Sequence, residues 1–329
     1  MKFLIVGATG YIGKFITSHL SNVYGKENID VYVRSSKKAE TLKNLVNFIF
    51  FADLAKDNIS LLKEKHYDFV ILAHGKILGH TYRSIYLNNR KTVRNILKNI
   101  NKGSLKQIIY LSSVAAGGFK DDIDGQKTML HPDNAYGLAK LKTEELLIRF
   151  GIDNAVRIAI LRPPVVYGKV SGIDFDYFIK GCKLGYLQYI SGNPYVSLCS
   201  VENLAEAIVC AIENNAKGVY QIADDKRYTI QDVCNVIREA FSLKRTRLRG
   251  AFLKPIVNTL TRVALKFNNF SFPYVFLLQA MHNPYYCNID KAKIELGYRP
   301  KDSFEKYFTS RLAKNYFTKT YLNDEYVND

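Results

Sequence analysis

Apolar and polar positions recur along the first half of the chain with two kinds of spacing, one typical of strands and one typical of helices. Residues 2–6 form an apolar run of strand length, and apolar side chains then recur at helical spacing at positions 12, 15, 16 and 20. Further strand-like runs lie at 31–33, at 68–73 and in the segment that ends at 110–113. The alternation continues to about residue 165 and predicts an α/β fold, a doubly wound parallel sheet with helices on both faces.

The second half of the chain is less regular. A length of 329 residues exceeds the usual size of a single core, so a second lobe is expected. Residues 169–195 are loop-rich and aromatic, whereas 195–201 and 218–222 are expected to be strands that return to the sheet. We predict a sheet domain of residues 1–165 with returning strands at about 195–223. A smaller, mainly helical lobe would comprise about 166–194 and 224–315, and 316–329 would be a frayed tail.

A glycine-rich turn joins the first predicted strand to the first predicted helix. Gly7 permits a tight turn, Gly10 lets the backbone approach a pyrophosphate, and Gly13 lets the helix pack on the strand. The amides at the helix N-terminus then face the phosphates. This arrangement predicts a Rossmann-type dinucleotide site, to which the turn contributes Gly7, Thr9, Gly10, Tyr11, Ile12 and Gly13.

Tyr136 and Lys140 form a Tyr-x-x-x-Lys step on a predicted helix. Residues four apart leave the same helix face, so the ammonium of Lys140 can lie near the phenol of Tyr136 and favour its ionised form. The pair is therefore a candidate proton donor and acceptor.

The Gly-x-x-Gly-x-x-Gly spacing together with Tyr136 and Lys140 resembles the extended short-chain dehydrogenases/reductases, often called the NAD-dependent epimerase/dehydratase family. The resemblance spans roughly residues 1–310. Further matching motifs occur in order at residues 53–54, 68–73, 110–113, 162–168, 200–205, 290–292 and 296–300.

The resemblance implies roles for individual residues. Ser113 would hydrogen-bond the carbonyl or carbinol oxygen of the substrate, with Ser112 as the alternative, and Tyr136 would pass the proton. Lys140 would also hold the nicotinamide ribose, while the cofactor would supply the hydride. The further cofactor-binding residues that the resemblance implies are Asp53, Leu54, Ala73, His74, Asn89 and Pro163. Asn88 fits the family asparagine almost as well as Asn89.

Two departures from family patterns narrow the chemistry. In sugar-nucleotide 4,6-dehydratases the catalytic hydroxyl is followed by Asp and Glu, whereas Val114 and Ala115 follow Ser113, so dehydration loses its acid and base. The acidic residue expected after the second strand, where it would bind the adenosine ribose, is replaced by Arg34 and Ser35. Because a cationic, hydroxyl-rich turn suits a 2′-phosphate, NADP is favoured over NAD.

These observations favour an NAD(P)-dependent oxidoreductase of a sugar nucleotide, and specifically a 4-keto sugar reductase that uses exchangeable NADPH. The alternatives are a sugar-nucleotide epimerase, which retains its cofactor, and a reductase of a lipid-like or steroid-like ketone. A diphosphate substrate would be clamped by basic residues such as Arg245, Arg247 or Arg249, and an apolar substrate could lie against residues 270–278. A non-catalytic cofactor sensor is disfavoured, because a pure sensor need not keep all of Ser113, Tyr136 and Lys140.

Charge and composition limit the partners. Lys and Arg number 47 against 30 Asp and Glu, giving a net charge of +17, but they are scattered and match no nucleic-acid-binding module. An anionic small molecule or an acidic lipid surface is the expected partner, which allows peripheral membrane association. With no apolar run of about 18 residues, we expect a cytoplasmic protein without a membrane span. The five cysteines, odd in number and widely spaced, are interpreted as reduced packing residues, and no metal is expected. The resemblance implies a homodimer.

Overall fold

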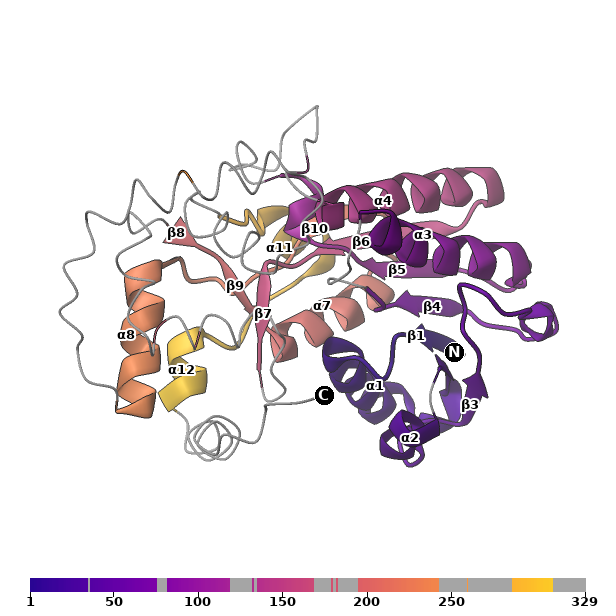
Figure 1. Ribbon diagram of the computed structural model, residues 1–329, viewed down its shortest axis with the longest axis horizontal. Coiled ribbons are helices and arrows are strands. Elements are labelled where there is room, and N and C mark those ends of the chain that lie inside the picture. Colours follow the sequence, from indigo (N-terminus) through magenta and orange to yellow (C-terminus); the bar gives the residue numbers. More distant parts are fainter. Residues whose placement is uncertain are drawn as a thin grey trace.

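The computed structural model describes residues 1–34, 36–75, 82–118, 135–168, 195–242 and 286–309, and the single positions 132, 179, 182 and 259. Its centre is a seven-stranded sheet with the order β10-β6-β5-β4-β1-β2-β3 (Figure 1). Every pair of neighbouring strands in it is parallel. The strands are β1 (Phe3–Val6), β2 (Ile29–Val33), β3 (Phe48–Phe51), β4 (Phe69–Leu72), β5 (Gln107–Leu111), β6 (Arg157–Arg162) and β10 (Gly218–Gln221). The predicted doubly wound sheet is confirmed.

Helices cover both faces of this sheet. Helices α1 (Tyr11–Tyr24) and α7 (Val201–Glu213) pack together on one face, and α3 (Tyr82–Asn99) and α4 (Ala135–Asn154) pack together on the other (Figure 1). The strands are mostly apolar because each contributes to two cores: in β1, Phe3 and Ile5 belong to one cluster, Leu4 and Val6 to the other. Shorter helices complete the unit: η1 (Lys26–Asn28), α2 (Ser36–Ala39), η2 (Glu40–Leu42), η3 (Ser60–Lys63), η4 (Val114–Ala116) and α11 (Asp290–Leu296).

The strand at one edge of the described sheet, β3, is unusually aromatic. Phe48 is 52% and Phe51 60% exposed, although Phe50 packs on the core. The ammonium of Lys65 lies 5.8 Å from the ring centre of Phe48 and 5.7 Å from that of Phe50.

A third apolar cluster lies beyond the sheet. It includes Tyr167, Tyr228 and Phe304 and joins α8 (Ile230–Phe241) to α12 (Phe304–Thr309). The strand expected at 195–201 forms as β8 (Tyr195–Val196) and β9 (Leu198–Ser200), but neither enters the central sheet. β8 pairs with β11 (Tyr228–Thr229) and β9 with β7 (Val165–Tyr167) in two small sheets, whereas β10 returns to the central sheet as expected. The boundaries between the two predicted units stay a prediction.

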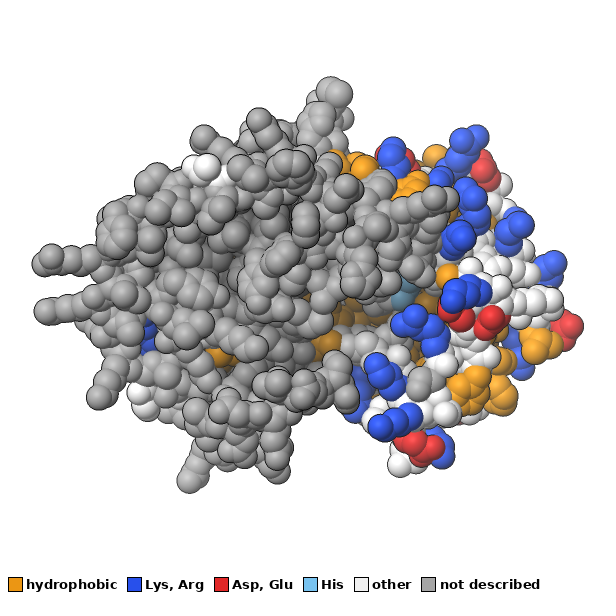
Figure 2. Space-filling model, viewed as in Figure 1, with side chains coloured by type: hydrophobic (Ala, Val, Ile, Leu, Met, Phe, Trp, Pro, Cys, Tyr) orange, Lys and Arg blue, Asp and Glu red, His pale blue; other side chains and the backbone are white. Residues whose placement is uncertain are grey.

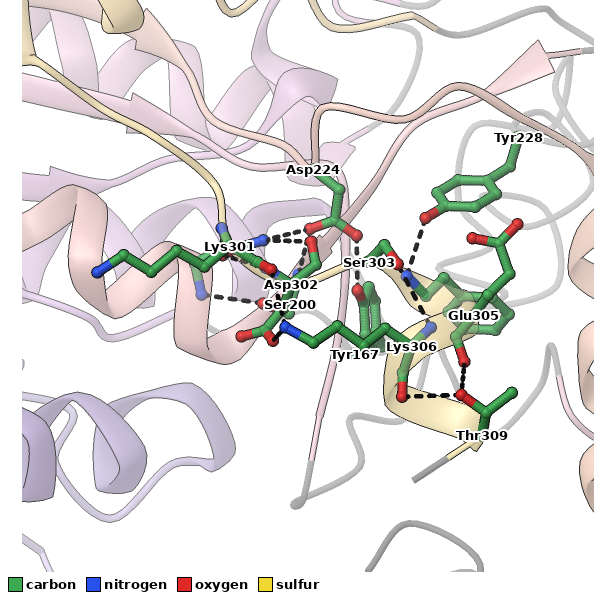
Figure 3. A network of polar contacts seen from close by, with 12 residues as sticks. Tyr167, Ser200, Asp224, Tyr228, Lys301, Asp302, Ser303, Glu305, Lys306 and Thr309 are labelled. Carbon is green, nitrogen blue, oxygen red and sulfur yellow. Dashed lines mark hydrogen bonds and ion pairs between the residues drawn. The ribbon is translucent and has the colours of Figure 1, made fainter. Parts of the chain in front are cut away.

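A buried polar network connects the central sheet with the C-terminal segment (Figure 3). The carboxylate of Asp224, just after β10, accepts hydrogen bonds from the Tyr167 hydroxyl at 2.6 Å, the Ser200 amide at 3.0 Å and the Asn203 side chain at 2.8 Å. Burial raises the pKa of Asp224 to about 7. The side-chain oxygen of Asn203 in turn accepts from the backbone amides of Lys301 and Asp302. The motif at 200–205 thus ties distant parts of the chain together.

The variant Asn203→Ala is expected to lower the free energy of unfolding by about 3 kcal/mol, because it leaves several buried donors and acceptors unpaired. Asn214→Ala is a matched control, since Asn214 lies at the other end of α7 and its side chain donates to two carbonyls near the surface. That variant should cost about 1 kcal/mol. Equal losses for both variants in chemical denaturation would contradict the role given to the network.

Candidate active site

The glycine turn brings backbone segments closer than any side chain allows. Gly7 has φ +93°, and a Cβ there would lie 2.6 Å from the backbone nitrogen of His74. A Cβ on Gly13 would lie 2.0 Å from the carbonyl oxygen of Gly7. The first glycine therefore lets the ends of β1 and β4 meet, and the third lets α1 pack on the turn.

Helix α1 begins at Tyr11 without a side-chain cap and without an acidic residue in its first turn. The amide of Gly10 donates to the carbonyl of Gly7 at 3.0 Å, which closes the turn in front of the helix. Thr9, Gly10 and Ile12 retain exposed surface there, while the Tyr11 hydroxyl donates to the carbonyl of Val166 at 3.1 Å. A cradle of this shape fits a pyrophosphate, because the first amides of a helix attract an anion.

Arg34 lies at the carboxyl end of β2 and is exposed. The described residues that follow, 36–39, carry two further exposed cations, Lys37 and Lys38, and no acidic side chain. Ser35 lies outside the described residues. The region is thus electropositive where a ribose 2′-substituent would lie.

Asp53 and Leu54 follow β3 at the same edge of the sheet. The Asp53 carboxylate accepts from the amide of Ala55 at 3.1 Å, so it stabilises its own turn. The carbonyl of Leu54 accepts from the Asn95 side chain at 3.0 Å, which anchors this turn to α3. Their assignment to cofactor binding stays a prediction.

The buried side chain of Lys140 contacts several of the predicted site residues. Its Nζ donates to the carbonyl of Leu111 at 2.6 Å and to that of His74 at 3.5 Å. It lies 4.7 Å from the ring centre of Tyr110 and 5.7 Å from that of Tyr136. The structure therefore brings the two members of the Tyr-x-x-x-Lys step together, and burial lowers the pKa of Lys140 to about 7.

Ala73 and His74 follow β4 beside the glycine turn. The amide of Ala73 donates to the carbonyl of Val6 at 2.9 Å. The His74 ring is 3.4 Å from the carbonyl oxygen of Asn89, and its Nδ1 is buried without a hydrogen-bond partner among the described residues. Burial, reinforced by Lys140, lowers the pKa of His74 to about 4, so the ring is neutral at pH 7. A buried, unpaired ring nitrogen beside Lys140 suits a ligand in this cradle.

The side chain of Asn89 is buried, whereas nothing is described of the Asn88 side chain. The position of Asn89 behind His74 favours it as the asparagine of the site. The choice between the two stays a prediction.

The two serines after β5 have different surroundings. The Ser112 hydroxyl donates to the buried carboxylate of Glu144. Ser113 caps η4 instead, its Oγ accepting from the amide of Ala115 at 3.2 Å. The amide of Val114 donates to the carbonyl of Pro163 at 3.2 Å, so Pro163 positions this turn through its backbone. Since the Ser112 hydroxyl is hydrogen-bonded to Glu144, Ser113 is the better candidate for the hydroxyl that binds the substrate oxygen.

Gly137 contributes a close approach that the sequence analysis missed. A Cβ on this residue would lie 2.1 Å from the carbonyl oxygen of Ala115, so α4 contacts η4 backbone to backbone. The sequence does indicate this contact, because a glycine inside a predicted helix, here between Tyr136 and Lys140, is unfavourable unless close packing requires it.

Several predicted residues lie outside the described residues, namely Arg245, Arg247, Arg249 and the segment 270–278. Within the described part of the chain, no cluster of three or more His, Cys, Asp or Glu side chains could hold a metal ion. No helix in the described part of the chain combines the length and the apolarity that crossing a bilayer requires. On the face shown in Figure 2, Lys and Arg side chains are scattered over the described part, in keeping with the dispersed charge expected from the sequence.

Comparison with known proteins identifies relatives of the chain. A family model described as the NAD dependent epimerase/dehydratase family matches residues 3–223. An uncharacterized protein of Sinorhizobium fredii, y4nL, is 26% identical over 255 residues, which is 71% of each chain. The N-acetyl-alpha-D-glucosaminyl-diphospho-ditrans,octacis-undecaprenol 4-epimerase of Escherichia coli O157:H7 is 24% identical over 250 residues, 73% of this chain and 72% of that protein.

Among solved structures, UDP-glucuronic acid 4-epimerase from Bacillus cereus in complex with NAD superposes with a TM-score of 0.73. The match covers 99% of both chains at 19% identity. It shows that the two proteins share a fold.

The variant Gly137→Ala is expected to lower the free energy of unfolding by about 2 kcal/mol, although alanine is the better helix former. The reason is the clash of the new Cβ with the Ala115 carbonyl, which must push α4 away from η4. Gly103→Ala is the control, because among the described residues a Cβ there would meet the Asn101 side chain alone, at an ordinary contact distance of 3.4 Å. Thermal and chemical unfolding measure both, and a Gly137→Ala protein as stable as the wild type would disprove the close approach.

Proposed function

We propose a function for this chain on the premise that it belongs to the NAD dependent epimerase/dehydratase family and is an extended short-chain dehydrogenase/reductase. In this proposal it interconverts a carbinol and a ketone on a diphosphate-linked sugar. The observation that carries the proposal is the grouping of Lys140, Tyr136 and the Ser113 turn beside a cradle that fits a dinucleotide. The relative from E. coli, whose name describes a 4-epimerase of a diphosphate-linked sugar, supports this substrate class and C4 as the reacting carbon.

The bound nicotinamide cofactor would accept or supply the hydride. Ser113 would donate a hydrogen bond to the substrate oxygen, and Tyr136 would take or give its proton. Lys140, with its ammonium 5.7 Å from the ring centre of Tyr136, would favour the phenolate through its charge and hold the ribose hydroxyls. Val114 and Ala115, which follow Ser113, are buried and apolar, so no side chain at these positions could eliminate water.

Two net reactions are compatible with this chemistry. Reduction of a 4-keto sugar by exchangeable NADPH is favoured by Arg34 and the cations of α2, which suit a 2′-phosphate. Epimerisation at C4 on a retained NAD is favoured by the 4-epimerases among the relatives and structural neighbours. Reduction of a lipid-like ketone, the diphosphate clamp of the second lobe and assembly as a homodimer stay predictions.

The charge-reversal variant Arg34→Asp tests the cofactor preference. We expect the wild-type protein to bind NADP at least about tenfold more tightly than NAD, and Arg34→Asp to reverse that order, because a carboxylate repels the 2′-phosphate and accepts from the 2′-hydroxyl. Titration calorimetry measures both. Lys63→Asp, in η3 between β3 and β4, makes the same charge change away from the predicted cofactor contacts and should leave the ratio unaltered. NAD preference in the wild type, or NAD retained on purification, would favour epimerisation instead.

The variant Tyr136→Phe tests the proton-transfer role. Its kcat on the accepted substrate should fall by about 10³, with the Kd of the cofactor unchanged, because only the proton carrier is removed. Candidate substrates are UDP-linked sugars and their 4-keto derivatives, with NADPH oxidation followed optically and C4 epimers separated by chromatography. Tyr195→Phe, which alters an exposed tyrosine, is the control. Undiminished turnover by Tyr136→Phe would rule out the catalytic assignment.

A further inference from the structure

Helix α4 contacts the turn that carries Ser113 through successive residues on one helix face. Gly137 contacts the carbonyl of Ala115, and Lys140 donates to the carbonyl of Leu111. One turn further on, Glu144 accepts from the hydroxyl of Ser112. Since positions i, i+3 and i+7 share a face, the turn is held by three residues of one helix.

Glu144 is also held from the sheet. It is 2% exposed and accepts two hydrogen bonds from Arg162 of β6, from Nε at 3.0 Å and from Nη2 at 2.6 Å. The paired arginine is buried as well. A buried ion pair contributes little net stability compared with apolar residues of similar size, because both charges lose their hydration. The pair therefore calls for a role beyond stabilising the fold.

We propose that Glu144 is a positioning residue of the reaction. With Arg162 it fixes the Ser112–Ser113 turn against α4, and its negative charge, one helical turn from Lys140, stabilises the ammonium that acts on Tyr136. This inference rests on the proposed function, in which Tyr136 transfers the proton.

Among the described residues around Lys140, Glu144 is the group that supplies a negative charge to stabilise the ammonium. Among the described residues, the titratable groups that face Lys140 are Tyr136 and Glu144 on α4, Tyr110 on β5 and His74 after β4. Arg162 on β6 is paired with Glu144. His74 is neutral, and neither tyrosine supplies a negative charge in its protonated form. Burial lowers the pKa of Lys140 to about 7, and the Glu144 carboxylate opposes that decrease.

Removing the Glu144 charge removes the influence that raises the pKa of Lys140, so its pKa must fall below the wild-type value of about 7. At neutral pH a larger fraction of the lysine would then be the uncharged amine. The field that favours the Tyr136 phenolate would be lost although Tyr136 and Lys140 are both intact.

The test is a pH titration of the protein labelled with [ε-¹³C]lysine, followed by NMR, in which the Lys140 signal is assigned from its absence in Lys140→Arg. In Glu144→Gln the Lys140 midpoint is expected to fall by about one pH unit or more, a tenfold change in the protonation equilibrium. Glu145→Gln is a matched control, because it removes the same charge from the next residue, where Glu145 pairs with Lys142 at the surface. An unchanged Lys140 midpoint in folded Glu144→Gln would overturn the proposal.

A second variant covers the case in which an unpaired Arg162 prevents folding. Glu144→Gln/Arg162→Gln replaces the ion pair by two amides, and the Lys140 midpoint should again fall. Glu144→Asp retains the charge and should shift the midpoint less than Glu144→Gln. If the double variant folds with an unchanged midpoint, Glu144 acts on packing alone and the proposal fails.

Turnover provides an independent readout. On a substrate accepted by the wild type, Glu144→Gln should lower kcat more than KM, with its largest effect near pH 7, where the protonated fraction of Lys140 changes most. A purely structural role would lower activity equally at all pH values. If the wild-type protein turns over none of the sugars, the proposed function fails, whereas the NMR titration still decides whether Glu144 stabilises the charge of Lys140.

Discussion

The candidate site depends on contacts between backbone segments, and these contacts are possible only where side chains are absent. Gly7 lets the end of β1 meet the end of β4, and Gly13 seats α1 on the turn between them. Gly137 does the same between α4 and η4. The first two contacts fix the cradle and the third fixes the Ser113 turn, because close-packed backbone cannot yield as a flexible side chain can. The positions of Lys140, His74 and Ser113 follow from them.

Local patterns in the sequence were sufficient for much of this arrangement. The alternation of strand-like and helix-like runs gave the parallel sheet, since buried strands and amphipathic helices differ in period. The glycine spacing gave the turn, and the four-residue step placed Tyr136 beside Lys140, because helical geometry is set within one turn. The pairing partners of strands far apart in the sequence could not be predicted from local patterns. The segment at 195–200 forms strands, yet its partners are β7 and β11 and not the central sheet.

Within the site, the roles of residues adjacent in the sequence could be distinguished only from their three-dimensional surroundings. Ser112 and Ser113 are equivalent as a sequence pattern, but Ser112 is engaged by Glu144, which arrives from α4, 32 residues away. Glu144 was overlooked for the same reason, because a charged residue on a predicted helix face is expected at the surface. Arg162 was noted only as the first residue of the motif at 162–168, and its ion pair with Glu144 follows from no local pattern. The network around Asp224 likewise unites residues of β7, β9, α7 and the C-terminal segment, which no local period relates.

The aromatic edge strand β3 has a consequence for the behaviour of the chain in solution. Among the described residues β3 pairs with β2 alone, and such a strand edge with exposed Phe48 and Phe51 favours the addition of a further strand, whether from another copy or from an unfolded chain. Lys65 counters this, since its ammonium lies over the rings of Phe48 and Phe50 and would be stripped of water by an incoming strand. Mutual repulsion between copies of charge +17 acts in the same direction, but it weakens as salt is added. Added salt is therefore expected to favour self-association of the chain through this edge.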